Sequence, residues 1–283
     1  MAPNKKSVVG FEDEAALVRT AARSLKAHAI LVKAGKYRAG ELKIIGPAKP
    51  PRSVSVVANV KENTDSLFRV LLLSHELREA GAKRVELIAP WIAYGRQDRV
   101  VHPGEEPAGL MVGRLLSAMF DRIITLDAHS QAFMDSYKGK LVDVIPWQTI
   151  KAKNIDLVAA PDHGAAWRAS YAADALGVPF VVIEKKREGK IVKSKLPLGT
   201  KAKGARVLLV DDIADSGGTL KAAARELKKA GASQITALVT HAFGLSRLQR
   251  HLRPEIISIR AVFDHAAGKL EPEAFGMLVK AVR

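Results

Sequence analysis

The regular alternation of short apolar runs with longer amphipathic stretches is the feature that most constrains the fold of this chain. Such an alternation is typical of βαβ units that build a mostly parallel sheet. In the first half, it predicts strands at residues 28–33, 53–59, 84–90, 122–127 and 141–145, and helices at residues 12–25, 64–80 and 107–120. In the second half, it predicts strands at residues 156–160, 179–184, 205–210, 234–240 and 255–262, and helices at residues 164–176 and 217–230. We therefore expect an α/β fold.

The length of the chain indicates two domains. A chain of 283 residues is long enough for two cores of ordinary size. Residues 146–153 are the most plausible joint, so the expected domains are residues 1–147 and residues 148–283. Each should hold a mostly parallel sheet flanked by helices. No short-period repeat is visible in the sequence, which excludes a solenoid.

Composition excludes several other classes. Hydrophobic residues make up 48% of the chain and charged residues 26%, which fits a globular protein and not a disordered one. The chain has no cysteine, which excludes disulfides, thiolate metal sites and thiol catalysis. No apolar run approaches the roughly 18 residues that a membrane span needs, so no membrane partner is expected. The polar start of the chain has no apolar signal core, and we expect a cytoplasmic location.

The net charge points to anionic partners. Lys and Arg number 45 and Asp and Glu number 29, which gives +16 at pH 7. Residues 185–206 hold nine basic residues and one acid, a net charge of +8, so half of the surplus lies in this one segment. Nucleic acid, acidic lipid and phosphorylated small molecules all fit such a charge. Aromatic residues make up only 5% of the chain and no nucleic-acid-binding module is recognisable, so no nucleic acid partner is expected.

The strongest chemical signal is the segment VLLVDDIADSGGTL at residues 207–220. A buried strand is predicted to end at Asp211 and Asp212, whose carboxylates suit the hydroxyl groups of a sugar. Gly217 and Gly218 then let backbone N–H groups approach a phosphate without a Cβ in the way, and the helix N-terminus adds its partial positive charge. Ligands of open α/β sheets collect at this edge. The segment therefore predicts a site for a phosphorylated sugar.

A simpler interpretation of the same segment is a capped helix start. Ser216 would be the N-cap residue, and the aspartates would be solvated. Under the functional interpretation, the hydroxyl groups of Ser216 and Thr219 donate to the phosphate. The ordered combination of strand, paired carboxylates, glycines and hydroxyls favours the functional interpretation.

This segment resembles the ribose-5-phosphate loop of type I phosphoribosyltransferases and of phosphoribosyl pyrophosphate (PRPP) synthetases. Residues 90–99, PWIAYGRQDR, resemble the P-Y-x-x-Y-x-R-Q-D-R pattern of the synthetases, for which ordinary phosphoribosyltransferases are not known. Residues 126–129, LDAH, are similar to the metal segment D-L-H of that family. Residues 160–164, APDHG, and residues 183–187, IEKKR, resemble its S-P-D-x-G and I-D-K-R-R segments. The chain thus resembles the ribose-phosphate pyrophosphokinase (PRPP synthetase) family, and its length is similar to that of the shorter archaeal-type members.

The resemblance implies a fold and a reaction. The fold would be two tandem type I phosphoribosyltransferase-like domains, with the ATP side in residues 1–147 and the ribose 5-phosphate side in residues 148–283. The reaction would move the β,γ-pyrophosphoryl group of ATP to the C1 hydroxyl of ribose 5-phosphate, giving PRPP and AMP for nucleotide biosynthesis. Mg²⁺ would be the cofactor, and the protein would be a homo-oligomer, a dimer or a larger assembly of dimers.

The resemblance also implies roles for individual residues. The catalytic residues would be Lys185 and Arg187. ATP would be bound by Tyr37, Glu41, Arg96 and Gln97. Ribose 5-phosphate would be bound by Asp211, Asp212, Asp215, Ser216, Gly217, Gly218 and Thr219. The metal would be bound by His129 and Asp162. Residues 35–41, GKYRAGE, depart from the family pattern G-R-F-x-D-G-E because Ala39 replaces an acid, which leaves the nucleotide donor open.

Two alternatives within this chemistry remain. One is a type I phosphoribosyltransferase that consumes PRPP, against which the segments at residues 96–98 and 185–187 argue. The other is a non-catalytic regulatory relative of the synthetases, against which Lys185, Arg187, His129 and Asp211 argue. No Walker A motif occurs, so a P-loop nucleotide site is not expected.

Overall fold

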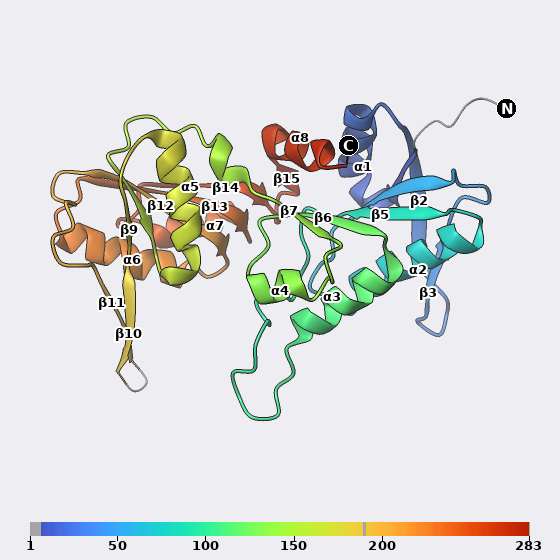
Figure 1. The fold of residues 1–283 in the computed structure, drawn as a ribbon, viewed down its shortest axis with the longest axis horizontal. Coiled ribbons are helices and arrows are strands. Elements are labelled where there is room, and N and C mark those ends of the chain that lie inside the picture. Colours follow the sequence, from blue (N-terminus) through green and yellow to red (C-terminus); the bar gives the residue numbers. More distant parts are fainter. Residues whose placement is uncertain (1–6, 189–190, 283) are drawn as a thin grey trace. The chain divides into compact units, whose positions relative to one another are not determined.

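The structure, a computed structural model, describes residues 7–188 and 191–282, without the side chains of residue 149 and residues 185–194. The chain divides into two compact units, residues 1–144 with 275–283 and residues 145–274 (Figure 1). The sequence predicts a boundary after residue 147 and a C-terminus that belongs to the second domain. The structure instead groups residues 275–283 with the first unit, and Phe275, Leu278 and Val279 of α8 (Pro272–Lys280) are buried.

The first unit is built on a seven-stranded sheet in the order β3-β2-β1-β4-β5-β6-β7. Neighbouring strands pair in parallel, except that β2 and β3 form an antiparallel hairpin at one edge. The strands are β1 (Ser7–Phe11), β2 (His28–Lys36), β3 (Leu42–Ile45), β4 (Ser53–Val57), β5 (Arg84–Ile88), β6 (Arg122–Leu126) and β7 (Leu141–Val144).

Helices of this unit contribute apolar faces to its core. They are η1 (Glu12–Glu14), α1 (Ala15–Leu25), α2 (Thr64–Glu79), α3 (Ala108–Met119) and α4 (Gln131–Asp135). Leu73 and Leu77 of α2 and Leu116 of α3 are fully buried in one cluster with strand residues such as Leu87. Asn63 caps α2 by accepting a hydrogen bond of 2.7 Å from the backbone N–H of Ser66, which fixes where the helix begins.

The second unit has a six-stranded sheet in the order β15-β14-β13-β12-β8-β9. Its pairs are parallel except for β14 and β15. The strands are β8 (Leu157–Ala160), β9 (Phe180–Val182), β12 (Arg206–Ala214), β13 (Gln234–Ala242), β14 (Ser258–Asp264) and β15 (Lys269–Leu270). A separate antiparallel hairpin, β10 (Glu184–Glu188) with β11 (Ile191–Lys195), projects from the body of this unit (Figure 1).

Helices again supply the apolar faces that cover the second sheet. They are η2 (Pro146–Thr149), η3 (His163–Ala165), α5 (Ala166–Leu176), α6 (Gly218–Lys229) and α7 (Leu245–Leu252). Leu220 and Leu227 of α6 pack with Val207 and Leu209 of β12 in one core cluster, while Ala169 of α5 belongs to another cluster. In the described residues, no helix is long and apolar enough to cross a bilayer.

The strand order gives each unit one topological switch point. In the first unit, β1 is followed by β2 on one side, whereas β4, β5, β6 and β7 run in succession on the other side. In the second unit, β8 is followed by β9 on one side, and β12, β13 and β14 run on the other. Crevices open at the carboxyl ends of the two strands that flank such a point. These strands are β1 and β4 in the first unit and β8 and β12 in the second.

The α/β architecture predicted from the alternation is confirmed, and the differences are local. β12 and β13 are longer than expected, because their parallel ladder continues to the pair of Ala214 with Ala242. The short elements β1, β3, α4, α7 and α8 were not among the predicted ones.

Candidate functional site

Asp211 and Asp212 lie within the last part of β12 and not after it. The ladder to β13 continues past them, with Asp211 opposite Val239 and Ile213 opposite His241. The Asp211 carboxylate accepts a hydrogen bond of 3.0 Å from the backbone N–H of Asp212, whose own carboxylate accepts one of 2.8 Å from Ile213 N–H. These local bonds hold two carboxyl groups at the carboxyl end of the strand that flanks the switch point.

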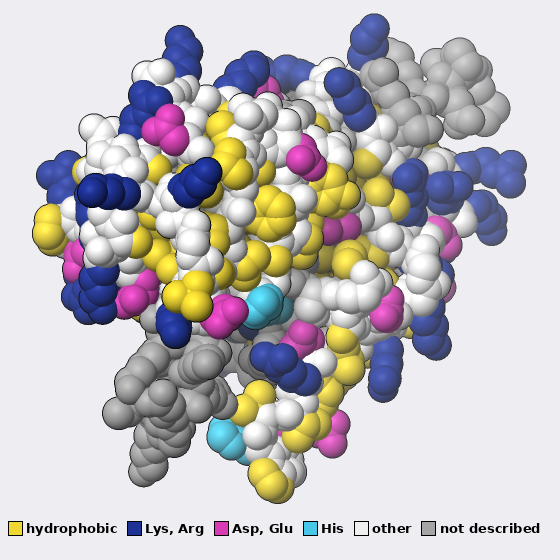
Figure 2. All heavy atoms as spheres, turned by 60° about the vertical axis from the view of Figure 1, so that its left-hand side comes forward, with side chains coloured by type: hydrophobic (Ala, Val, Ile, Leu, Met, Phe, Trp, Pro, Cys, Tyr) yellow, Lys and Arg dark blue, Asp and Glu magenta, His cyan; other side chains and the backbone are white. Residues whose placement is uncertain are grey.

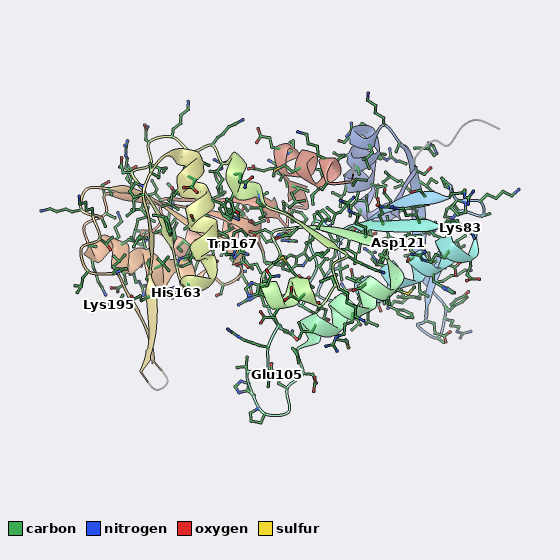
Figure 3. The ribbon with its side chains drawn as sticks, viewed as in Figure 1. Lys83, Glu105, Asp121, His163, Trp167 and Lys195 are labelled. Carbon is green, nitrogen blue, oxygen red and sulfur yellow. The ribbon has the colours of Figure 1, made fainter. Side chains whose placement is uncertain are left out.

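A buried arginine that the sequence analysis did not single out faces this pair. Arg168 of α5 is 1% exposed, and its Nη2 lies 3.5 Å from Oδ2 of Asp212. Its Nη1 donates a hydrogen bond of 3.2 Å to the carbonyl of Gly164, and its guanidinium lies 4.3 Å from the ring centre of Trp167, which Figure 3 labels on α5. Because a buried charge needs a partner, Arg168 compensates the buried Asp212.

The charges around Asp211 change its acidity. Part of this residue is exposed, yet its carboxyl group lies among protein atoms, and this burial raises its pKa well above the usual range. The charge and hydrogen bond of Asp212 and the charge of Asp162 raise the pKa further, whereas Arg168 lowers it. The predicted sugar-binding and metal-binding carboxylates are therefore close enough to interact.

Asp162 follows β8, the other strand at the switch point. It is the N-cap of η3, where its Oδ1 accepts a hydrogen bond of 3.0 Å from the backbone N–H of Gly164. His163, labelled in Figure 3, is the first residue of η3. The two chain segments that the sequence analysis assigned to a metal and to a sugar thus meet at one sheet edge.

The predicted phosphate loop leads directly into α6. Gly217 has φ = +80° and precedes the first helical residue, Gly218, whose N–H donates to Ser216 Oγ at 3.3 Å. A Cβ on Gly217 would lie 3.1 Å from methyl groups of both Leu248 and Leu252 in α7. Glycine is therefore required here both by the left-handed backbone and by the close approach of α7.

A second residue that the sequence analysis missed is Arg247 of α7. Its Nη2 donates hydrogen bonds to the backbone carbonyls of Asp215, at 3.0 Å, and Phe243, at 2.9 Å, and lies 3.6 Å from Oδ1 of Asp215. Its side chain is 58% exposed, so the charge stands beside the phosphate loop and in contact with solvent. No motif marks Arg247, because its partners are set by the packing of α7.

Two predicted catalytic residues lie on the projecting hairpin. Lys185 and Arg187 belong to β10, where their backbones pair with Ser194 and Val192 of β11. Their side chains lie outside the described part of the chain.

The predicted ATP residues of the first unit fall into two places. Tyr37 and Glu41 lie at the turn of the β2–β3 hairpin, where the N–H of Tyr37 donates to the carbonyl of Glu41 at 2.8 Å. Tyr37 is 53% exposed, with Lys43 Nζ at 5.2 Å from the centre of its ring. Ala39 sits in the same turn. This hairpin occupies one edge of the sheet, with β1 and β4 between it and β5.

Arg96 and Gln97 lie instead on the connection from β5 to α3. This connection is tied down by backbone bonds from Gln97 N–H to Tyr94 O and from Gly109 N–H to Gln97 O, of 2.8 and 2.9 Å. A Cβ on Gly95 would lie 3.5 Å from the Cβ of His129, so the predicted metal histidine adjoins this segment. The same connection continues through Glu105, which Figure 3 labels.

Glu62 of the β4–α2 connection accepts two hydrogen bonds from the β5–α3 connection. Its Oε1 accepts a hydrogen bond of 3.0 Å from Trp91 Nε1, and its backbone carbonyl accepts one of 3.0 Å from the hydroxyl of Tyr94. The aromatic residues of the PWIAYGRQDR motif thus anchor the connection that carries Arg96.

His129 and Asp162 belong to different units. In the described residues, no group of three or more His, Asp or Glu side chains is gathered as a protein-only metal site. On the face shown in Figure 2, Lys and Arg side chains are scattered among Asp and Glu.

Known proteins resemble this chain in both units. Residues 7–119 match the N-terminal domain of ribose phosphate pyrophosphokinase, and residues 138–275 match the phosphoribosyl transferase domain. The ribose-phosphate pyrophosphokinase of Thermococcus kodakarensis is 33% identical over 236 residues, which cover 82% of this chain and 82% of the relative. That of Pyrococcus furiosus is 31% identical over 215 residues, which cover 74% and 77%.

One solved structure resembles the chain over nearly its full length. It is the phosphoribosylpyrophosphate synthetase from Mycobacterium smegmatis, with a TM-score of 0.78 and 21% sequence identity. The match covers 98% of this chain and 99% of that chain. At this identity, the similarity concerns the fold.

Proposed function

Since the chain belongs to the ribose-phosphate pyrophosphokinase family, we propose that it transfers the β,γ-pyrophosphoryl group of ATP to the C1 hydroxyl of ribose 5-phosphate. The products are PRPP and AMP, and the reaction serves nucleotide biosynthesis in the cytoplasm. The observation that carries the proposal is the loop before α6, which offers a helix N-terminus to a phosphate beside the carboxylates of Asp211 and Asp212.

Ribose 5-phosphate is bound at the switch point of the second unit. The 5-phosphate accepts hydrogen bonds from backbone N–H groups and hydroxyls of the loop formed by Asp215, Ser216, Gly217, Gly218 and Thr219. The side chains of Asp211 and Asp212 accept hydrogen bonds from the sugar hydroxyls. Because Asp212 is already held by Arg168, its carboxylate is oriented before the sugar arrives.

ATP is bound by residues of the first unit. The exposed side chains of Arg96 and Gln97 bind the nucleotide from the β5–α3 connection, and the hairpin presents Tyr37 and Glu41 to the base and ribose. The two pairs of proposed ATP-binding residues thus lie on opposite sides of β1 and β4 in the sheet. We also propose that the active assembly is a homo-oligomer built of dimers.

Pyrophosphoryl transfer demands positioning and charge stabilisation more than covalent chemistry by the protein. Lys185 and Arg187 stabilise the negative charge that develops on the migrating group, the first as a point charge and the second as a planar fork. Both stand on the projecting β10–β11 hairpin, and closure of this hairpin over ATP would exclude water from the reacting atoms.

The residues present fit Mg²⁺. The carboxylates of Asp162 and Asp211 are mutually repelling oxygen donors at one sheet edge, and Mg²⁺ prefers carboxylate and phosphate oxygens. When bound, the ion supplies positive charge that neutralises the phosphate oxygens. We propose that Asp162 holds the ion and that His129 is its second protein partner or contacts a phosphate. An imidazole is an uncommon ligand of this ion, which is why His129 has the phosphate contact as its alternative role.

A coupled assay tests the reaction. The protein is incubated with ribose 5-phosphate, Mg²⁺ and either ATP, ADP or GTP, and AMP and PRPP are measured together in the ATP reaction. We expect the two products to appear in a one-to-one ratio. AMP without PRPP, or consumption of PRPP with a nucleobase, would refute the assignment. Comparison of ATP, ADP and GTP also shows which nucleotide donor the protein prefers with Ala39 in place of the family's acid.

A pair of lysine variants tests the catalytic assignment. Lys185→Ala should lower kcat by about 10²–10³-fold while ribose 5-phosphate still binds, because a charge that acts on the transition state is lost. Lys195→Ala, on the partner strand β11 of the same hairpin, is the matched control and should keep its turnover. Equal effects of the two substitutions would remove Lys185 from its assigned role.

A further inference from the structure

A cavity of about 280 Å³ opens in the first unit, and none of its lining residues belongs to the connections that carry Arg96 and His129. It lies among three segments: Asp13 in the β1–α1 turn, Lys36 at the end of β2, and the β4–α2 connection with the start of α2. Two apolar residues of the β2–β3 hairpin, Ala34 and Leu42, also line it. Its size suits a ligand as large as a sugar phosphate.

The position of the cavity matches that of the phosphate loop in the second unit. The strands β2-β1-β4-β5 of the first sheet follow the same order as β9-β8-β12-β13 of the second. In the second unit, α6 begins after β12 beside the turn that follows β8. In the first unit, α2 begins after β4 beside the turn that follows β1. The cavity therefore occupies the switch point of its own sheet, where small ligands bind.

Three cationic side chains from three segments border the cavity. Lys36 Nζ lies 2.5 Å from Asp65 Oδ2, Lys61 Nζ lies 3.3 Å from Glu14 Oε1, and Arg69 Nη1 lies 2.9 Å from Asp13 Oδ2. The Lys36 and Asp65 side chains are 52% and 49% exposed, and exposed pairs of this kind are weak and exchangeable. An incoming phosphate can replace Asp65 as the partner of Lys36, while the ion pairs of the largely buried Arg69 and Glu14 persist.

The guanidinium of Arg69 is held in a position from which it can bind a phosphate. Its guanidinium lies 4.3 Å from the centre of the Phe11 ring, and its side chain is 12% exposed. Within the described residues, its buried Nε has no hydrogen-bond partner. A guanidinium fixed by stacking and by ion pairs to Asp13 and Glu14 keeps its position without a ligand.

The carboxylates give the cavity a mixed character. Asp13 and Asp65 line it together with the cations and with Asn63 at the start of α2. A site of this kind resembles the phosphate loop of the second unit, where carboxylates stand beside a helix N-terminus. An anion without hydroxyl groups would bind only the cations of the cavity. A phosphorylated polyol would bind the cations through its phosphate and the carboxylates through its hydroxyl groups.

We propose that this cavity is a second small-molecule site, which binds a phosphate monoester that carries sugar hydroxyls. Lys36, Lys61 and Arg69 bind the phosphate, and Asp13 and Asp65 accept hydrogen bonds from the hydroxyls. Sugar phosphates and nucleoside monophosphates share this chemistry. Binding at this site requires no turnover, so it stands apart from the proposed activity.

The three tryptophans of the chain give a readout that separates the two sites. Trp91 Nε1 donates to Glu62, which lies on the β4–α2 connection between Lys61 and Asn63 of the cavity. Trp167 instead contacts Arg168 beside the carboxylates of the second unit. In ¹H–¹⁵N spectra of the full chain, the indole signal of Trp91 reports on the cavity, and that of Trp167 reports on the other site.

The experiment titrates the protein with ribose 5-phosphate, AMP or inorganic phosphate. We expect the first two to shift the Trp91 signal more strongly than inorganic phosphate, and the tighter of the two identifies the source. In Lys36→Ala/Lys61→Ala, the Kd from this signal should rise at least about tenfold, because charge-assisted hydrogen bonds are lost. Lys33→Ala/Lys43→Ala removes the same charge from the β2–β3 hairpin at two residues that do not line the cavity, and should leave the Kd unchanged.

Three outcomes would overturn the proposal. The first is a Trp91 signal that does not move with any of the three probes. The second is a shift that persists in Lys36→Ala/Lys61→Ala, which would locate binding at the Arg96 segment. The third is inorganic phosphate binding as tightly as both esters, which would remove the role of the hydroxyl groups.

Discussion

Arg168 is the residue on which the carboxylate pair of the second unit depends. It is buried with Asp212 at 3.5 Å, and neither side chain has more than 7% exposure. Breaking a buried pair by removing one partner leaves an uncompensated charge, which costs about 3–5 kcal/mol. Arg168 therefore stabilises the fold and orients a predicted substrate ligand at the same time.

Replacing Arg168 should expose this dependence. Arg168→Met is expected to lower the free energy of unfolding by about 3–5 kcal/mol, measured by urea denaturation. The double variant Arg168→Met/Asp212→Asn should recover a large part of that loss, because the buried charge is removed together with its partner. Arg250→Met, at an exposed position of α7, is the control and should change stability by less than about 0.5 kcal/mol. A double variant as unstable as the sum of the singles would contradict the pairing.

Gly217 links the backbone of the phosphate loop to α7. Gly217→Ala introduces a strained left-handed alanine and a Cβ at 3.1 Å from Leu248 and Leu252, so the loop or α7 must move. Gly177→Ala is matched, since Gly177 has φ = +67° and an added Cβ meets no atom within 4 Å. Both variants should lose about 1 kcal/mol of stability, but only Gly217→Ala should raise the KM for ribose 5-phosphate, with the KM for ATP unchanged. Equal KM values in the two variants would show that α7 does not set the loop.

Residues with sequence-local roles were predictable, and residues with distant partners were not. The glycines and hydroxyls before α6 form one contiguous motif, so their place at a helix N-terminus followed from the segment alone. Arg168 and Arg247 lie 44 and 32 residues from the aspartates that they contact, Asp212 and Asp215, and only the folded sheet brings them together. The catalytic roles of Lys185 and Arg187 remain predictions.

At the scale of elements, α6 and α7 form the support of the phosphate loop. Glu255, which follows α7, accepts a hydrogen bond of 2.9 Å from Arg225 Nε and has Lys221 Nζ at 3.9 Å. Both basic residues belong to α6. The hydrogen bond from Arg225, followed by a local backbone hydrogen bond and the charge of Lys221, lowers the pKa of the Glu255 carboxyl.

This lowered pKa predicts a pH-dependent contribution to stability. The ionised carboxylate is favoured in the folded state, so its contribution is fully present above the ordinary glutamate pKa of about 4.3 and is lost as the pH falls through the lower folded value. Glu255→Gln should therefore have a lower Tm than the wild type at pH 7, and the difference should close as the pH falls below about 4. Glu79→Gln, exposed at the end of α2, should follow the wild type at every pH. A difference that grows on acidification would contradict the direction of the shift.

Long periodic elements were predictable, whereas short ones depend on tertiary contacts. The predicted helix at residues 64–80 matches α2, because its apolar positions recur at helical spacing and Asn63 caps it. β1 has only five residues and includes Gly10, so its sequence carries little strand signal, yet all five are buried between β2 and β4. α7 has eight residues and is mostly polar, and its two buried leucines, Leu248 and Leu252, belong to a core cluster that only the folded second unit brings together.

At the scale of the whole molecule, the chain contains two sheets of the same strand order and returns to the first unit at its end. Residues 145–274 are thus connected to the first unit at both ends. The sequence predicts two similar α/β domains but does not indicate this return, because α8 has an ordinary amphipathic pattern that fits either core. The burial of Phe275, Leu278 and Val279 is a property of the folded unit.

Because residues 275–283 belong to the first unit, a substitution in α8 should lower the stability of that unit. Leu278 is fully buried, so Leu278→Ala should cost about 2–5 kcal/mol and act on the unit that contains it. In hydrogen exchange measured by mass spectrometry, peptides from residues 7–144 should lose protection, whereas peptides of β12 and β13 should keep it. Leu227→Ala, at an equally buried position of α6, should give the opposite pattern. If Leu278→Ala instead deprotects both units equally, the two units unfold as one, and the last residues of the chain stabilise the whole molecule.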